Sequence, residues 1–278
     1  ANSLYPFCMT FNLPAGDYRK EGLPEEGRVQ KILELLASYK HDMSKTGYLI
    51  EVSYEVPEDK HDFFDYAPVK KNYINPNELS KYTHLLGEGL GYELQEHEWP
   101  ESYNEGDQDP PGVKLFPYLG KHEKVMHHAA LLKYYVELGV VITEVHSLWS
   151  FRQEPWMREY IMGQGKKRAE SKDEVQKSVI KKNMNTLYGY SLKDKRGYRN
   201  QNPHTDQAEF ERQVSKLTAC DWNVMKYWSE EDPTFFALIE TLSESGVVLD
   251  TPRLLGFTIL ELSKLHMYKA HYGYFKKN

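Results

Sequence analysis

Residues 47–57 carry the pattern that most constrains the fold of this chain, because every second side chain is apolar. This two-residue period is typical of a β-strand with one buried face. The apolar side is formed by Tyr48, Ile50, Val52, Tyr54 and Val56. Residues 28–40 instead place apolar side chains three and four apart, which predicts an amphipathic helix. A chain that interleaves both periods irregularly is predicted to have an α+β fold.

The same reasoning predicts the remaining elements. Helices are expected over residues 122–138, about 168–187 with an end at Gly189, 208–245 with a break at Pro233, and 257–275. Strands are expected over residues 140–151 and 247–249. Long loops with short elements are expected over residues 58–112, and a polar, basic loop over 193–206.

Composition excludes several classes of protein. Two cysteines are too few for a disulfide framework or a zinc site, so we expect a reducing, intracellular compartment. No apolar run approaches the roughly 20 residues that span a bilayer, so no membrane partner is expected. The net charge is −6, yet residues 166–199 carry 11 basic and 4 acidic side chains. This segment is either a local anion-binding site or a solvated helix face.

Two short motifs suggest a function. The first is Ser3-Leu-Tyr-Pro6, and the second is Lys181-Lys-Asn-Met-Asn-Thr-Leu-Tyr-Gly189. In this order they resemble motifs A and B of B-family DNA polymerases. Three further runs resemble the protein-primed branch found in Polinton/Maverick-type transposons, adenovirus-like viruses and linear plasmids. These runs are Lys114-Leu-Phe-Pro-Tyr-Leu, Phe151-Arg-Gln-Glu-Pro-Trp156, and the segment from Pro252 to Tyr268.

The resemblance implies a partial right-hand polymerase fold, with palm and fingers and inserted subdomains. Residues 1–12 would belong to the palm, and 13–154 would be a palm-associated insertion of the kind that contacts a priming protein. Residues 155–190 would form the fingers, 191–246 a second insertion near the DNA, and 247–278 the palm helix that leads to motif C. The reaction would add dNMP to a 3′-hydroxyl or to a hydroxyl of the priming protein.

The resemblance also implies site residues. In the family the tyrosine of motif A lies beneath the incoming sugar and excludes a 2′-hydroxyl, and the tyrosine of motif B faces the nascent base pair. The dNTP would be bound by Ser3, Leu4, Tyr5, Arg168, Lys177, Lys181, Asn185 and Tyr188. The template would be contacted by Thr186, Gly189, Lys193, Lys195 and Arg196.

Physical chemistry supports parts of this assignment. A triphosphate needs cations because negative charge must be neutralised as pyrophosphate leaves. Lys177, Lys181 and Asn185 are spaced four apart, so on one helix they form a polar row. Arg168 is offset by about 140° from Lys181 on an ideal helix, so it would join the site only through its long side chain or an irregular helix start. Because Pro6 restricts the preceding residue, we expect Tyr5 to be extended.

Several features depart from the family pattern. The metal-binding aspartate of motif A belongs immediately before Ala1, and the Asp-Thr-Asp of motif C belongs after Asn278. Ala1 could offer two Mg²⁺ ions its backbone carbonyl alone, so we expect an internal piece of a longer polymerase, inactive by itself. Tyr190 stands where the family usually has Lys or Arg, and Met184 and Thr186 replace the commoner Asn and Ser.

A rival interpretation is a non-enzymatic nucleic-acid-binding remnant of a domesticated mobile element. It would keep the basic surface and lack the catalytic carboxylates. The polymerase interpretation instead requires DNA template, primer, dNTP, Mg²⁺ and a terminal priming protein as partners.

Overall fold

The structure is a computed structural model that describes residues 4–73, 85, 89, 91, 113–195, 200–216, 219–226, 234–241 and 250–277. The chain divides into two compact units. One unit contains residues 1–14 and 155–260, and the other contains residues 15–154 and 261–278. Helices and antiparallel strands are both abundant, as the mixed sequence periods predict. No helix in the described ranges has the length and apolar character needed to cross a membrane.

A four-stranded sheet forms the centre of the second unit. Its strands are β1 (Leu13–Lys20), β6 (Val141–Glu154), β2 (Thr46–Glu55) and β5 (His122–His128), in that spatial order. β2 pairs antiparallel with both β6 and β5. The alternating segment at residues 47–57 is therefore confirmed as a strand, and Ile50, Val52 and Tyr54 are buried.

Helices pack on this sheet. α2 (Arg28–Ser38) confirms the predicted amphipathic helix and buries Ile32 and Leu36. α4 (Ala129–Leu138) ends at Gly139, whose φ of 106° is the left-handed conformation that glycine adopts readily. The C-terminal part of α8 (Arg253–Ala270) and a π-helical turn (His271–Phe275) complete the unit.

The predicted helix over residues 122–138 was wrong in its first half. His122–His128 pairs with β2 as an edge strand, so its backbone hydrogen bonds go to the sheet. The helix begins after His128, whose Nδ1 accepts a hydrogen bond from the Ala130 backbone N at 3.2 Å. Histidine is not a typical capping residue, so the helix start carried no recognisable signal.

Residues 58–117 contain a 3₁₀ helix and a pair of short antiparallel strands. β3 (Val69–Tyr73) pairs antiparallel with β4 (Val113–Pro117), and η1 spans Glu58–Phe63. Most of the predicted loops between these strands lie outside the described residues.

A buried carboxylate connects α8 to the sheet. Glu261 Oε2 lies 3.0 Å from His127 Nδ1 and 3.2 Å from the His128 backbone N, and Lys264 Nζ donates to Oε1 at 2.9 Å. His127 Nε2 lies 3.2 Å from the Tyr54 hydroxyl on β2. Burial alone would raise the pKa of Glu261, but His127 and Lys264 together lower it to about 2. The buried charge is thus fully paired, as such charges must be.

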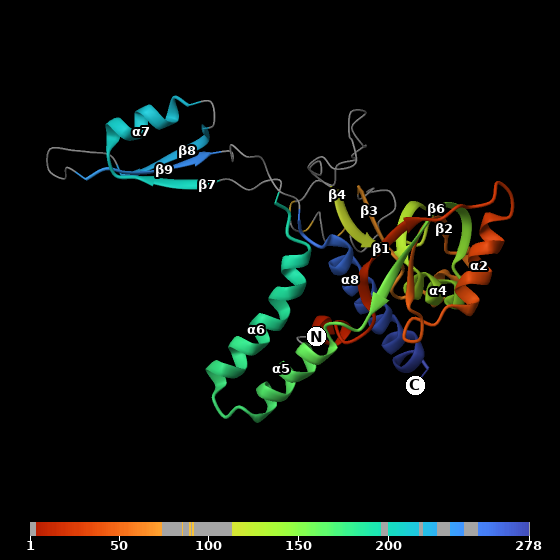
Figure 1. The fold of residues 1–278 in the computed structure, drawn as a ribbon. Helices are drawn as coiled ribbons and strands as arrows, with labels where there is room; N and C mark the ends of the chain where they lie inside the picture. The colour runs from red at the N-terminus through yellow and green to blue at the C-terminus, as the bar shows by residue number, and fades with distance from the viewer. Residues whose placement is uncertain are drawn as a thin grey trace. The chain divides into compact units, whose positions relative to one another are not determined.

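The first unit contains a helical hairpin and the N-terminal part of α8. α1 (Leu4–Cys8) and α6 (Glu174–Ser191) are in contact, and α5 (Arg158–Glu170) packs along α6 (Figure 1). The predicted helix over 168–187 is confirmed from Glu174 onward, but its start is wrong, because Arg168 belongs to the separate helix α5. The chain leaves α5 at Ser171, whose backbone is extended, and Asp173 caps the start of α6, because its Oδ1 accepts from the Val175 N at 2.9 Å. α6 also runs through Gly189 instead of ending there.

A small module occupies residues 200–241 of the same unit. β7 (Asn200–His204), β8 (Ala219–Lys226) and β9 (Phe236–Thr241) form an antiparallel sheet in the order β7-β9-β8, and α7 spans Gln207–Val214. The prediction that residues 208–245 are mainly helical was wrong for residues 219–226 and 236–241, which are strands, and the loop predicted over 193–206 contains β7. The strand predicted at 247–249 lies outside the described residues.

The tertiary fold explains why propensity failed in this module. Its core consists of Phe210, Phe235, Ala237 and Ile239. Only a sheet covered by α7 brings these apolar side chains together, and such packing overrides local preference.

The predicted C-terminal helix over residues 257–275 is confirmed, with a start at Arg253 and a π-helical end. Met267 is exposed, whereas Ile259, Leu262 and Glu261 are buried.

Acid should destabilise this protein through His128. Burial lowers the pKa of His128 to about 3 from 6.5, so the unfolded chain takes up the proton first. Stability is therefore lost as pH falls below 6.5, because a protonated ring cannot cap α4. His128→Asn keeps a capping side chain and removes this proton.

Between pH 6.5 and about 5 we expect the wild type to lose about 2 kcal/mol more unfolding free energy than His128→Asn. Urea unfolding of both proteins across this range measures the difference. Parallel pH profiles for the two proteins would contradict the account.

Candidate functional site

The two motifs meet in the first unit through a pair of stacked rings. Tyr5 on α1 and Tyr188 on α6 have ring centroids 4.0 Å apart and an interplanar angle of 9°. Burial is the main cause that raises the pKa of Tyr188 to about 12, and the neighbouring Tyr5 raises it further. The Tyr188 hydroxyl therefore stays protonated at neutral pH, and the pair offers flat aromatic surface and hydrogen-bonding hydroxyl groups.

Tyr5 is not extended, so that expectation was wrong. It lies in the first turn of α1, and its carbonyl accepts from the Met9 N at 3.0 Å. Pro6 follows it within the same turn, where a missing N–H breaks no helical hydrogen bond. The short helix, and not an extended strand, therefore sets the direction of the Tyr5 ring.

An open pocket of about 980 Å³ lies between α1, α5 and α6. Its apolar lining comes from all three helices, and its positive charge comes from the α5–α6 hairpin. The apolar residues are Leu4, Pro6, Phe7, Ile161, Met162, Ala169 and Met184, and the cations are Lys166, Arg168 and Lys177. The pocket therefore combines an apolar surface with a cationic side.

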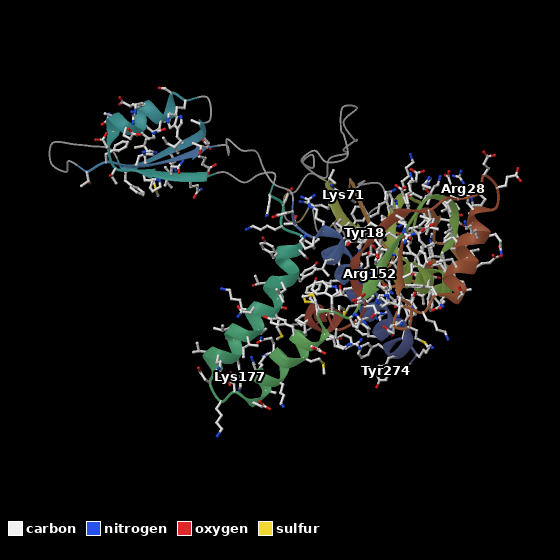
Figure 2. The ribbon with its side chains drawn as sticks, viewed as in Figure 1. Tyr18, Arg28, Lys71, Arg152, Lys177 and Tyr274 are labelled. Atoms are coloured by element: carbon white, nitrogen blue, oxygen red, sulfur yellow. The ribbon has the colours of Figure 1, made fainter. Side chains whose placement is uncertain are left out.

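The cations of the pocket differ in their partners. Lys177 donates to Glu174 at 2.7 Å, and Lys166 lies 3.8 Å from Glu170. Arg168 has no ion pair among the residues that the structure describes. Figure 2 labels Lys177 near the turn between α5 and α6. Arg168 is thus the cation best placed to pair with an added anion.

The structure brings together part of the predicted nucleotide site. Leu4, Arg168 and Lys177 line one pocket, although Arg168 belongs to a separate helix. The break after α5 removes the 140° offset that a single helix would impose. Lys181 and Asn185 are half-buried on α6, one and two turns beyond Lys177, but they do not line this pocket.

The predicted template contacts that the structure describes do not line this pocket. The Thr186 hydroxyl donates to the Lys182 carbonyl at 2.9 Å, and a Cβ at Gly189 would meet open space. Lys195 pairs with Asp250 and lies 5.9 Å from the ring of Tyr190. Lys193 is exposed after α6. Ala1, Ser3 and Arg196 lie outside the described residues.

Two residues that fix the pocket were not assigned a role from sequence. Trp156 Nε1 donates to the Pro14 carbonyl at 3.1 Å, and Arg158 Nε donates to the Thr10 carbonyl at 2.7 Å. Both bonds attach the start of α5 to the segment after α1. The signal was present, because Trp156 closes the Phe151–Trp156 run, but backbone carbonyl partners leave no trace in a sequence.

Met184 illustrates a departure from the family pattern that the structure explains. Its side chain is buried and lines the pocket. A polar residue there would need a hydrogen-bond partner, whereas methionine fills the space without one.

Close packing fixes the end of α6 against α8. A Cβ at Gly256 would lie 2.4 Å from Ser191 Oγ and 2.5 Å from Leu192 Cγ. Ser191 Oγ in turn donates to the Tyr188 carbonyl at 2.6 Å. The absence of a side chain at Gly256 therefore helps to hold the turn of α6 that carries Tyr188.

The described residues contain no group of three or more His, Cys, Asp or Glu side chains that could hold a metal ion. The pocket itself is lined by cations and apolar groups and by no carboxylate. Its residues therefore fit an anion with an apolar part, and they do not fit Mg²⁺.

Solved structures that are similar to this chain include two of the same polymerase. One is Phi29 DNA polymerase in an orthorhombic crystal form, with 14% sequence identity and a TM-score of 0.48. The other is Phi29 DNA polymerase complexed with primer-template DNA and incoming nucleotide substrates, with 16% identity and a TM-score of 0.44. Each covers 98% of this chain and 35% of the polymerase chain, so this chain spans about a third of that length. No protein-family profile and no curated protein sequence matches the chain.

Two glycine-to-alanine substitutions should distinguish the cost of overpacking at Gly256 from the gain in helix propensity. Gly256→Ala would force its Cβ into Ser191 and Leu192, and overpacking of this kind costs about 1–3 kcal/mol. Gly163→Ala on α5 is the matched control, because nothing lies within 4 Å of its Cβ. The control should gain up to about 1 kcal/mol, since alanine favours a helix over glycine. Urea unfolding measures both, and equal shifts in the two variants would refute the packing role.

Proposed function

We propose that this chain is the nucleotide-binding part of a template-directed DNA polymerase of the protein-primed B family. The observation that carries the proposal is the stack of Tyr5 on Tyr188. It joins the Ser-Leu-Tyr-Pro motif to the Lys-x-x-x-Asn-Thr-x-Tyr-Gly motif, although they are far apart in sequence. A coincidental motif match at either place would not require the two tyrosines to touch.

The pocket beside the stack has the chemistry that a deoxynucleoside triphosphate requires. Arg168, Lys177 and Lys166 supply positive charge for the phosphates. Tyr5 and Tyr188 supply aromatic surface for the sugar and the base pair. In this proposal Arg168 orients the triphosphate, and Glu174 holds Lys177 near it through their ion pair.

The proposed parts of the enzyme follow the chain. Residues 1–12 and 247–278 belong to the palm, and residues 155–190, which contain α5 and α6, belong to the fingers. Mg²⁺ is the proposed cofactor of the whole enzyme, although the lining of this pocket offers it no carboxylate. Template DNA, primer and a priming protein are the remaining proposed partners.

Nucleotide binding should depend on Arg168 more than on its neighbour Lys172. Arg168 lines the pocket, whereas Lys172 is exposed in the turn and does not line it. Loss of a charged hydrogen bond costs about 1.5–3 kcal/mol, so Arg168→Gln should weaken binding of a fluorescent dATP analogue by roughly 10- to 150-fold. Lys172→Gln removes the same charge and should change binding by less than about threefold.

The measurement is fluorescence titration of the 278-residue chain with the analogue, with unlabelled dATP as competitor. Equal losses in the two variants would mean that the segment acts as a diffuse basic surface. Binding of single-stranded DNA without any binding of dATP would instead favour the nucleic-acid-binding remnant.

A further inference from the structure

Ser53 belongs to a polar cluster of the second unit that the candidate nucleotide site does not use. Its hydroxyl oxygen, on β2, lies 2.7 Å from His146 Nε2 on β6. The Lys124 backbone N donates to the same oxygen at 3.2 Å. This amide would also stabilise the oxygen if it lost its proton, because a hydrogen bond to a charged form favours that form.

Glu144 lies on the other side of the His146 ring. Its Oε1 is 3.7 Å from His146 Nδ1, which is an ion-pair distance and too long for a close hydrogen bond. A carboxylate can only accept, so Glu144 favours the tautomer with the proton on Nδ1. Nε2 then accepts from the Ser53 hydroxyl. Serine, histidine and carboxylate thus follow one another in the order that activates a nucleophile in serine hydrolases.

Irregular backbone brings these side chains together. Ser53 and Glu144 are register partners in β2 and β6, and the register shifts close to this pair, so that His146 is the extra residue of β6. On the neighbouring strand β5, Lys124 has a φ of 50°, which is a strained conformation for a residue with a side chain. Strand irregularities and strained residues are frequent next to active sites.

A pocket of about 660 Å³ opens beside Ser53, His146 and Glu144, which all line it. Lys121, Lys124 and Thr143 also belong to its lining, which carries both signs of charge. Ser53 is 4% exposed and the His146 side chain 16%, so the pocket shields both from bulk water. A lysine ammonium or a threonine hydroxyl can stabilise an oxyanion that forms there. This lining suits a small polar substrate without net charge.

We propose that Ser53 is the nucleophile of a hydrolytic site for short, uncharged carboxylic esters, with His146 as general base and Glu144 as its positioning residue. Ser53 Oγ attacks the acyl carbon and gives its proton to His146 Nε2. The ester C–O bond breaks, and the alcohol leaves with that proton. Water then attacks the acyl-serine in the same way, which releases the acid and returns a proton to Ser53. This activity goes beyond nucleotide binding and does not depend on it.

The test uses the 278-residue chain and a fluorophosphonate probe, which phosphonylates an activated serine hydroxyl with loss of fluoride. We expect the label at Ser53, located by mass spectrometry after digestion. His146→Gln keeps a hydrogen-bond acceptor beside Ser53 and removes the base, so labelling should be roughly 100-fold slower. Ser147→Ala is the matched control and should label like the wild type, because the Ser147 hydroxyl donates to Glu51 at 2.9 Å instead of to a histidine.

Glu144 requires its own control, because its charge also belongs to the pocket lining. Glu144→Gln should lower the labelling rate at saturating probe by about tenfold or more, without changing the probe concentration that gives half of that rate. Glu55→Gln removes the same charge from the same lining and should leave the saturating rate unchanged. A purely structural or electrostatic role would affect both variants alike.

Two further measurements use the wild type. Unfolding in urea should abolish the label, and p-nitrophenyl acetate should be hydrolysed and should compete with the probe. A folded wild type that is not labelled at Ser53 would overturn the proposal, whatever the fold of the variants. Labelling at an undiminished rate in His146→Gln, or equal losses of rate in Glu144→Gln and Glu55→Gln, would overturn it as well. Binding of dATP is a separate assay, and its result does not affect this one.

Discussion

The carboxylate of Glu261 is fully buried, and its hydrogen bonds determine how α8 packs on the four-stranded sheet. An ionised carboxylate without partners would cost several kcal/mol in such a place. The carboxylate is hydrogen-bonded to His127, to the His128 backbone N and to Lys264. The other ring nitrogen of His127 is hydrogen-bonded to the Tyr54 hydroxyl of β2. β2, β5 and α8, which are far apart in sequence, are thereby held by one hydrogen-bonded network.

The same helix also contributes to the candidate site. At its N-terminal end, Gly256 lies against Ser191 and Leu192 at the end of α6, and Ser191 donates to the carbonyl of Tyr188. Helix α8 is therefore constrained by charge in one half and by close packing in the other. A substitution at either end is expected to alter the local structure there, because closely packed side chains leave no space for a shifted backbone.

Sequence reasoning located the elements whose periodicity is complete within one segment. Residues 47–57 and 28–40 show one clear period each, and both were confirmed as β2 and α2. It failed where long-range packing decides. Residues 219–226 and 236–241 form strands that pack Ala237 and Ile239 against Phe210, and the start of α6 is marked by a single capping aspartate.

The candidate site was predictable to a similar degree. The two motifs indicated which side chains to compare, and the structure places Leu4, Arg168 and Lys177 around one pocket. The anchors Trp156 and Arg158 were not predictable, because each donates to a backbone carbonyl that any residue could supply. The helical conformation of Tyr5 was missed because a proline usually disfavours it in the residue before.

The central claim is that Tyr5 and Tyr188 form one surface that recognises a deoxynucleotide. The most direct measurement is the ratio of dATP to ATP affinity of the 278-residue chain, for the wild type, Tyr5→Val and Tyr5→Phe. The account predicts that Tyr5→Val lowers the preference for dATP, because the smaller side chain leaves room for a solvated 2′-hydroxyl. Tyr5→Phe should keep most of the preference, because the ring excludes the hydroxyl. A preference that is unchanged in Tyr5→Val would contradict the account and leave the stack as packing alone.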